Sequence, residues 1–254
     1  MKLGWSNNMV LNLDRYLGKV KNRVSRVGIE LEGGWVTIPN GRNIVGDGSV
    51  FRHLTSAQKF EMVERRIALK GELPSEIMLP GHMSAWIKKY YPAYVNESCG
   101  LHVHMSFMNL QMYAALMVPD YPATVVAYLT KWAQQEELDQ KHPIWSRLQG
   151  DNEYCQHKFW PHLQVKDNHK DYDHNRVGCR YTHIAYRHGT HKTIECRLLP
   201  MFDDAKQSIR AVRSVIDITN ASLVVLRRKR EEKLRESLRL VNEDSVEHDI
   251  EIVS

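Results

Sequence analysis

The sequence has no apolar run near the roughly 20 residues that a membrane span requires. Residues 1–10 also lack a basic stretch followed by an apolar core, so we expect neither a signal peptide nor a membrane partner. The four cysteines form no Cys-x-x-Cys pair, which favours free thiols in a reducing, cytoplasmic setting over a disulfide framework. Internal repeats and low-complexity linkers are absent too, and the 254 residues predict a single α+β domain with an antiparallel or mixed sheet.

A strong excess of one charge is also missing. The chain carries 35 Lys and Arg against 30 Asp and Glu, a formal net charge of +5. This balance is compatible with phosphate-bearing ligands but is too mild by itself to indicate nucleic-acid binding. A nucleic acid bound through the basic segment 227–239 therefore stays an alternative that the composition does not favour.

What the sequence does contain is a strand pattern with two chemically different faces in the stretch 99–107. With a period of two residues, one face is apolar and the other carries Gly100, His102, His104 and Ser106. An apolar strand face does not require two imidazoles opposite it, so we interpret the polar face as functional. The alternative is a half-exposed strand with two ordinary surface histidines.

Two further stretches show the same design. Glu30 and Glu32 share one face of a strand predicted at about 26–38, and Glu195 and Arg197 share one face of a strand at 193–199. If the three strands lie in one sheet, carboxylates, imidazoles and a guanidinium converge. Crowded carboxylates repel one another unless cations lie among them, and oxygen ligands favour Mg²⁺ or Mn²⁺. The pattern therefore predicts a metal site.

A short apolar strand is expected at 75–80, where Glu76 is either a further acidic metal ligand, which we favour, or an exposed edge residue. The segment Gly46-Asp47-Gly48-Ser49 has the composition of a turn. Apolar spacing predicts helices at about 56–70, 83–91 and 122–140. Residues 205–241 are predicted as one long helix or as two that break near Thr219-Asn220.

The end of the last predicted helix is highly charged from residue 227 to 239. Only Leu234, Leu238 and Val241 form a thin apolar stripe there, which favours a solvated helix end, with a subunit contact as the alternative. The acidic segment 242–254 is expected to be a flexible tail.

Residues 141–191 are the least regular part and hold eight of the thirteen histidines. Their spacing does not match a closed zinc site, so we predict a loop that lies over a pocket. Arg176, Arg180 and Arg187 within it either meet phosphate or are solvated.

In order along the chain, several motifs resemble those of the amidoligase family, carboxylate–amine ligases that many phage and bacterial genomes encode. The motifs are Gly28-x-Glu30-x-Glu32, Gly46-Asp47-Gly48-Ser49, Glu76-Ile77, Gly100-Leu101-His102-Val103-His104 and Thr193-Ile194-Glu195-x-Arg197. The resemblance spans about residues 24–200. It implies a glutamine synthetase-like fold, with a curved, mostly antiparallel sheet and helices on one face, and one catalytic domain over residues 1–241.

Glutamine synthetases are similar at three of these motifs, and that similarity implies roles for individual residues. Metal ligands for Mg²⁺ or Mn²⁺ would be Glu30, Glu32, Glu76, His102 and Glu195. His102 would also lie near a phosphate of ATP, and the chain around His104 and Ser106 would line the nucleotide. Arg197 would hold a carboxylate or a phosphate. Residues 110–191 match nothing in the family, so the resemblance names neither the acid nor the amine.

The implied activity is ATP-dependent formation of an amide or peptide bond through an acyl phosphate, with Glu195 and Arg197 as catalytic residues. The substrates would be a small-molecule or peptide carboxylate and an amine. A guanidino-type phosphotransferase, or a non-catalytic protein that binds a ligand or nucleic acid on the same fold, are the alternatives. The crowding of carboxylates further predicts that Glu195→Gln leaves stability unchanged or raises it. The sequence indicates no oligomeric state.

Overall fold

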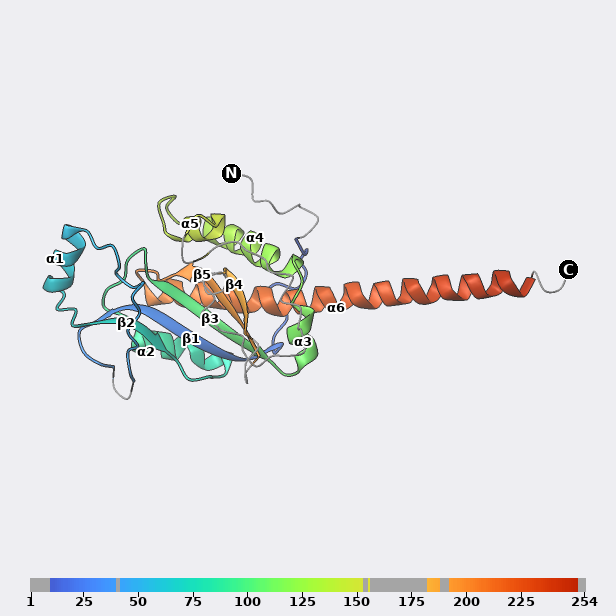
Figure 1. Cartoon of the computed structure of the whole chain (residues 1–254), viewed down its shortest axis with the longest axis horizontal. Helices are drawn as coiled ribbons and strands as arrows, with labels where there is room; N and C mark the ends of the chain where they lie inside the picture. Colours follow the sequence, from blue (N-terminus) through green and yellow to red (C-terminus); the bar gives the residue numbers. More distant parts are fainter. Residues whose placement is uncertain (1–9, 40–41, 153–154, 156–181, 188–191, 251–254) are drawn as a thin grey trace.

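The computed structural model describes residues 10–39, 42–152, 155, 182–187 and 192–250 (Figure 1). The fold is α+β, as the sequence predicts. Its elements in chain order are β1 (Val24–Trp35), α1 (Ser56–Glu64), β2 (Leu69–Pro74), the short 3-10 helix η2 (Pro80–His82), α2 (Met83–Tyr90), β3 (Gly100–Phe107), α3 (Leu110–Ala115), α4 (Asp120–Gln135), α5 (Ile144–Gln149), β4 (Ile184–Arg187), β5 (Thr193–Pro200) and α6 (Ala205–Ile250).

Five strands form one sheet in the order β2-β1-β3-β5-β4, and every neighbouring pair is antiparallel. The three strands predicted from their alternating faces are therefore neighbours at its centre. Their apolar side chains form one continuous face of the core, with at most 1% of each exposed: Val27, Ile29, Leu31, Leu101, Val103, Met105, Ile194, Cys196 and Leu198. Because alternate residues of a strand point to opposite faces, the polar residues between them all lie on the other face.

Helices complete the core. Helix α6 runs past the sheet and contacts all three central strands through its first half, where Ile209, Val212 and Ile216 are buried (Figure 1). Helix α4 packs on α6, and α2 contacts both α6 and β1. These contacts hold the sheet as a rigid support for the side chains of its polar face.

The chain between 56 and 80 differs from its prediction. The helix expected to reach residue 70 ends at Glu64, and Arg66 adopts a positive φ of 56°, which a continuing helix does not allow. Residues Leu69–Pro74 then pair with β1 as an edge strand, while the strand expected at 75–80 contributes only the isolated bridge of Met78 to Val27. Gly71 and Pro74 are residues that weaken a strand prediction, so the local sequence does not indicate β2. The strand forms through its pairing with β1, which is distant in the chain.

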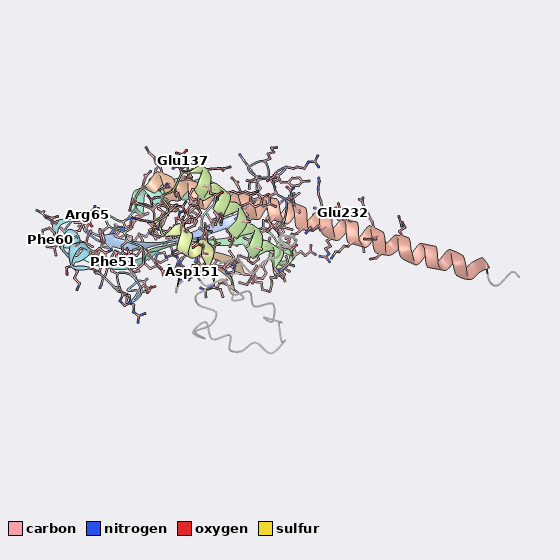
Figure 2. The ribbon with its side chains drawn as sticks, turned by 90° about the horizontal axis from the view of Figure 1, so that it is seen from above. Phe51, Phe60, Arg65, Glu137, Asp151 and Glu232 are labelled. Atoms are coloured by element: carbon pink, nitrogen blue, oxygen red, sulfur yellow. The ribbon has the colours of Figure 1, made fainter. Side chains whose placement is uncertain are left out.

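Helix α6 also differs, because it continues past the predicted end at 241 as far as Ile250 (Figures 1 and 2). Residues 205–250 contain neither glycine nor proline, so no local signal stops the helix. The first part of the segment expected to be a flexible tail is thus helical. Within the described residues, no helix is both long and apolar enough for a membrane crossing.

Candidate metal and phosphate site

Strand register brings four of the predicted site residues together on the polar face of the sheet. Glu30 of β1 lies opposite His102 of β3, and His104 lies opposite Glu195 of β5. Directly paired residues on one face have Cβ atoms about 5 Å apart, close enough for their side chains to meet. An irregularity in the β3–β5 register between Leu101 and Val103 shifts the following residues of β5 against β3.

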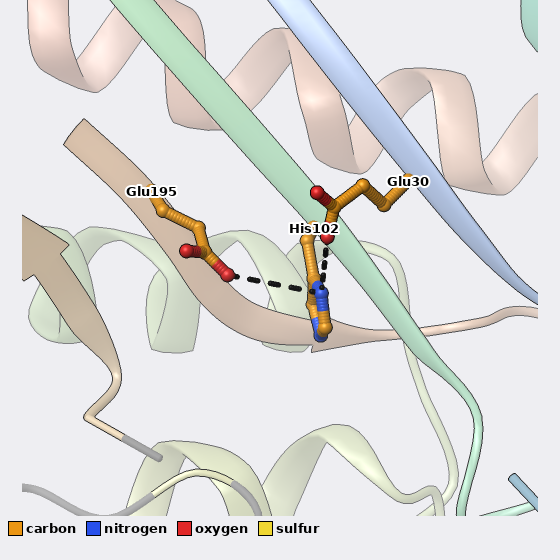
Figure 3. Close-up of side chains that lie close together, drawn as sticks. All are labelled: Glu30, His102 and Glu195. Atoms are coloured by element: carbon orange, nitrogen blue, oxygen red, sulfur yellow. Dashed lines mark hydrogen bonds and ion pairs between the residues drawn. The ribbon is translucent and has the colours of Figure 1, made fainter. Parts of the chain in front are cut away.

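Glu30 lies between the two imidazoles. Its Oε2 is 3.0 Å from Nδ1 of His102 (Figure 3). Its Oε1 is 2.7 Å from Nε2 of His104. Burial favours the protonated carboxyl, but hydrogen bonds with His102 and His104 outweigh burial and lower the pKa of Glu30. Nδ1 of His102 is also 3.8 Å from Oε1 of Glu195, so Glu30, His102 and Glu195 form a first cluster of potential metal ligands.

Glu195 is fully buried and is held by two arginines. Nη1 of Arg197 donates to its Oε1 at 2.5 Å, while Nε of Arg187 donates to its Oε2 at 2.7 Å and Nη2 of Arg187 to the same oxygen. Burial alone would raise the pKa of Glu195, but the charges of Arg197, His104 and Arg187 lower it to about 2. Nε of Arg197 is buried and has no hydrogen-bond partner among the described residues, so one of its donors remains for a ligand.

This geometry reverses the expectation that Glu195→Gln would be neutral or stabilising. Glu195 is compensated by guanidinium groups and is not simply crowded by other carboxylates. Removing its charge leaves two arginine side chains facing a neutral amide in a buried setting, which is destabilising. Arg187 lies in the segment for which the sequence predicts no regular structure, so the sequence does not predict its side-chain contact with Glu195.

A second cluster consists of Glu32 of β1, Asp47 and Glu72 of β2. One ligand atom of each lies within 4.8 Å of the others. Oε1 of Glu32 is 3.6 Å from Nε2 of His102, so His102 lies between the two clusters. The other oxygen of Glu32 accepts a hydrogen bond from the backbone N–H of Gly100.

The positions of Asp47 and Glu72 depend on the edge of the sheet. Val45 and Glu72 exchange two backbone hydrogen bonds, of 2.8 and 2.9 Å, which lay the segment before Asp47 along β2. Gly71 has φ +148°, and a Cβ there would collide with the carbonyl oxygen of Val45, so only glycine permits this approach. Asp47 is fixed by hydrogen bonds from the N–H and the hydroxyl of Ser49, at 2.7 and 2.6 Å.

Glu76, predicted as a metal ligand, is not brought to either cluster. Its side chain is 83% exposed and forms an ion pair of 2.9 Å with Arg42. The reason is the shifted strand: β2 ends at Pro74, and the register places Glu72, not Glu76, opposite Glu32. The sequence around Glu72 does not indicate a strand or a ligand, because Glu72 lies in the short segment Gly71-Glu72-Leu73-Pro74, where glycine and proline interrupt any alternating pattern.

A pocket of about 200 Å³ adjoins the first cluster on the same face of the sheet. Glu30, His104, Ser106 and Thr193 contribute to its lining. For two of these, His104 and Ser106, the resemblance to glutamine synthetases implies a place beside the nucleotide.

Both clusters offer the donor types that Mg²⁺ and Mn²⁺ prefer, but they differ in charge. The arginines already compensate Glu195 in the first cluster. In the second, burial and the charges of Glu30, Glu32, Asp47 and Glu195 raise the pKa of Glu72 to about 7. Glu32, Asp47 and Glu72 therefore fit a divalent cation best, because binding one would relieve their mutual repulsion.

Comparison with known proteins finds no match. This holds for models of protein families, for curated proteins and for solved structures. The interpretation of the site therefore depends on its residues and geometry. For residues 141–191 the sequence predicts a loop over a pocket and no closed zinc site. These predictions concern mainly residues 153–154, 156–181 and 188–191, which lie outside the described part of the chain.

The raised pKa of Glu72 predicts a pH effect on stability in metal-free protein. Because this pKa lies near 7 when folded and near 4.5 ordinarily, ionisation of Glu72 costs stability progressively as the pH rises from about 4.5 to 7. In EDTA, Glu72→Gln should therefore melt at a higher temperature than wild type at pH 8 and at a similar temperature at pH 4.5. Thermal denaturation followed by circular dichroism measures this difference, and equal melting temperatures at pH 8 would contradict the crowded cluster.

Proposed function

We propose that the protein is an ATP-dependent carboxylate–amine ligase of the amidoligase type, with the glutamine synthetase-like fold of that family. The observation that supports it is one sheet face that carries two possible sources of positive charge, a site for a divalent cation and an arginine with a free donor. Glu32, Asp47 and Glu72 offer a site for a divalent cation, and Arg197, which contacts Glu195 of the first cluster, offers an unused donor. A carboxylate that attacks a polyphosphate brings two anions together, so positive charge must be supplied from both sources.

In the proposed reaction, an oxygen of the substrate carboxylate attacks the γ-phosphorus of ATP. The P–O bond to the β-phosphate breaks, and ADP leaves with the electron pair. The amine nitrogen then attacks the carbonyl carbon of the acyl phosphate, which releases inorganic phosphate, and the nitrogen loses a proton. A divalent ion bound by the second cluster would neutralise charge on the phosphate oxygens.

The side chains have distinct roles in this proposal. Arg197 donates hydrogen bonds to the phosphate or to the substrate carboxylate, and a planar guanidinium suits both anions. Glu195 is a positioning residue that orients Arg197 and Arg187. The pocket beside Glu30, with His104 and Ser106 in its lining, is assigned to part of the nucleotide.

Nucleotide binding should need a divalent ion. Isothermal titration calorimetry with a non-hydrolysable ATP analogue is expected to show at least about tenfold tighter binding with Mg²⁺ than with EDTA, because the second cluster repels phosphate when it holds no cation. Glu72→Gln should reduce this gain from Mg²⁺. Glu76→Gln is the matched control and should keep it, since Glu76 is exposed and outside the clusters. Equal affinities in Mg²⁺ and EDTA would contradict the proposal.

The reaction itself is tested by its products. Purified protein is incubated with ATP, Mg²⁺ and pools of carboxylates and amines, ADP release is measured, and the products are identified by mass spectrometry. An amide together with ADP and phosphate is the expected result. A phosphorylated guanidino compound without an amide would instead assign the site to phosphotransfer, and binding without ADP release would assign it to a non-catalytic role.

A further inference from the structure

Helix α6 leaves the folded body as a long projection (Figures 1 and 2). Where the helix leaves the body, Arg228 donates to the hydroxyl of Tyr16, and Lys229 forms an ion pair of 3.2 Å with Asp120. Every side chain from Arg227 to Arg239 is exposed, including that of Glu232, which Figure 2 labels. Residues 230–250 thus form a projecting helix of about 30 Å, at 1.5 Å per residue. Most of the stability of protein helices comes from packing of an apolar face, so a partner would stabilise it.

The projecting helix has a narrow apolar seam. Leu234 and Leu238 are 61% and 57% exposed, and Val241 follows at the next position of the same line. Spacings of four and three residues are those of a coiled-coil seam, which is narrower than the buried face of a globular helix. In the first half of α6, by contrast, the apolar residues are buried against the sheet.

Charge along this helix is segregated by sign. Residues 227–239 contain seven Lys or Arg and three Glu, whereas residues 240–250 contain four Asp or Glu and no Lys or Arg. The positions that flank the seam follow the same division, with Arg230 and Arg235 in the first half and Asp244 and Asp249 in the second. Flanking charges of this kind set the partner and the orientation of paired helices.

We propose that the projecting helix pairs with the projecting helix of a second copy of this chain, in antiparallel orientation. A parallel pair would place each half beside the same half of its partner, so arginine would face arginine and aspartate would face aspartate. An antiparallel pair centred between Arg239 and Leu240 places the basic half of each copy along the acidic half of the other.

The same alignment also brings the apolar seams together and keeps the two folded bodies apart. With this centre, Leu238 of each copy lies level with Val241 of the other, so the apolar residues meet near the twofold axis. The two folded bodies lie at opposite ends of the paired helices, because each helix leaves its body near residue 229, about 15 Å from the centre. The pairing leaves the candidate metal and phosphate site untouched, so it is independent of the proposed function.

Sedimentation equilibrium of the full chain tests the proposal with two charge-reversed variants. Wild type should be a reversible dimer that weakens in high salt, because its charge pairs are solvent-exposed. Arg230→Glu with Arg235→Glu makes both flanks acidic, and Asp244→Arg with Asp249→Arg makes both basic. Each variant alone should be monomeric, while an equal mixture of the two should restore the dimer. A monomeric wild type at about 100 µM, near the limit of weak specific pairing, or an unrestored mixture would overturn the proposal.

The matched control reverses two charges on the opposite side of the same helix. Glu232→Arg with Glu236→Arg lies away from the Leu234–Leu238 seam, so this variant should dimerise as wild type does. Loss of its dimer would contradict pairing through the seam. Circular dichroism of all variants checks that the helical content is kept.

Orientation is tested by cross-linking under oxidised glutathione. A mixture of Leu238→Cys and Val241→Cys chains should form a disulfide-linked heterodimer much faster than either chain forms a homodimer, with wild type as the control for its native cysteines. Faster linking of Leu238→Cys to itself would show a parallel pair and would overturn the antiparallel assignment.

Discussion

Glu195→Gln should abolish ATP consumption and lower the free energy of unfolding by about 3–5 kcal/mol, the cost of breaking a buried ion pair. Glu195 is completely buried, and its two oxygens hold Arg187 and Arg197. The amide of glutamine presents one oxygen in place of the charged pair, so both guanidinium groups lose a charged partner. Chemical denaturation measures the stability, and ADP release with the identified substrates measures the activity. Wild-type ATP consumption in Glu195→Gln would contradict the assignment of this face.

Two further variants separate loss of the site from loss of the fold. Arg197→Lys keeps a positive charge near Glu195 but lacks the planar set of donors, so activity should fall at least about tenfold while the melting temperature changes little. Glu76→Gln removes a carboxylate from an exposed ion pair with Arg42, which contributes at most about 1 kcal/mol. It should retain both stability and activity.

Gly100→Ala should weaken divalent-ion binding about 10- to 100-fold, the range seen when residues that position metal ligands are changed. A Cβ at residue 100 would lie 2.6 Å from Nε2 of His102 and 3.0 Å from Oε2 of Glu32. Both side chains would have to move, and His102 lies between the two clusters. Overpacking of this kind also destabilises by about 1–3 kcal/mol. Calorimetric titration with Mn²⁺ measures the affinity.

Gly81→Ala provides the matched control for Gly100→Ala. A Cβ at Gly81 would meet no atom within 4 Å, so Mn²⁺ affinity and stability should stay near those of wild type. Unchanged Mn²⁺ affinity in Gly100→Ala would contradict the roles of Glu32 and His102 in the metal site.

Part of the fold follows from local sequence because alternation within a strand is a local property. The predicted stretches at about 26–38, 99–107 and 193–199 correspond to β1, β3 and β5, and their apolar residues are buried as expected. The helix predicted at 83–91 corresponds closely to α2. The prediction was wrong where an element depends on a tertiary contact, as for β2, which lies at Leu69–Pro74 and not at 75–80.

The N-terminal segment shows how little local pattern marks a contact made at long range. Leu11 and Leu13 are buried, and their backbone N–H groups donate to the hydroxyls of Thr124 and Tyr128 on α4, at 2.8 and 2.7 Å. In the sequence they belong to the short apolar stretch from Met9 to Leu13 in a largely polar segment, which is too short to establish a period of two or 3.6 residues. Only the position of α4 gives them a place in the core.

By itself, the sequence determined which faces of the three central strands carry polar groups, because side chains alternate along every strand. It therefore identified Glu30, Glu32, His102, His104, Glu195 and Arg197 as candidates. Only the tertiary structure decided which carboxylates join them. The pairing of β2 with β1 places Glu72 opposite Glu32, and the segment hydrogen-bonded to β2 places Asp47 beside them. Glu76 lies beyond the end of β2, where it is exposed to solvent and paired with Arg42. Strand pairing joins residues distant in the chain. A shift by an even number of residues, such as the four from Glu76 to Glu72, changes which side chain reaches the site while leaving the alternation of faces the same.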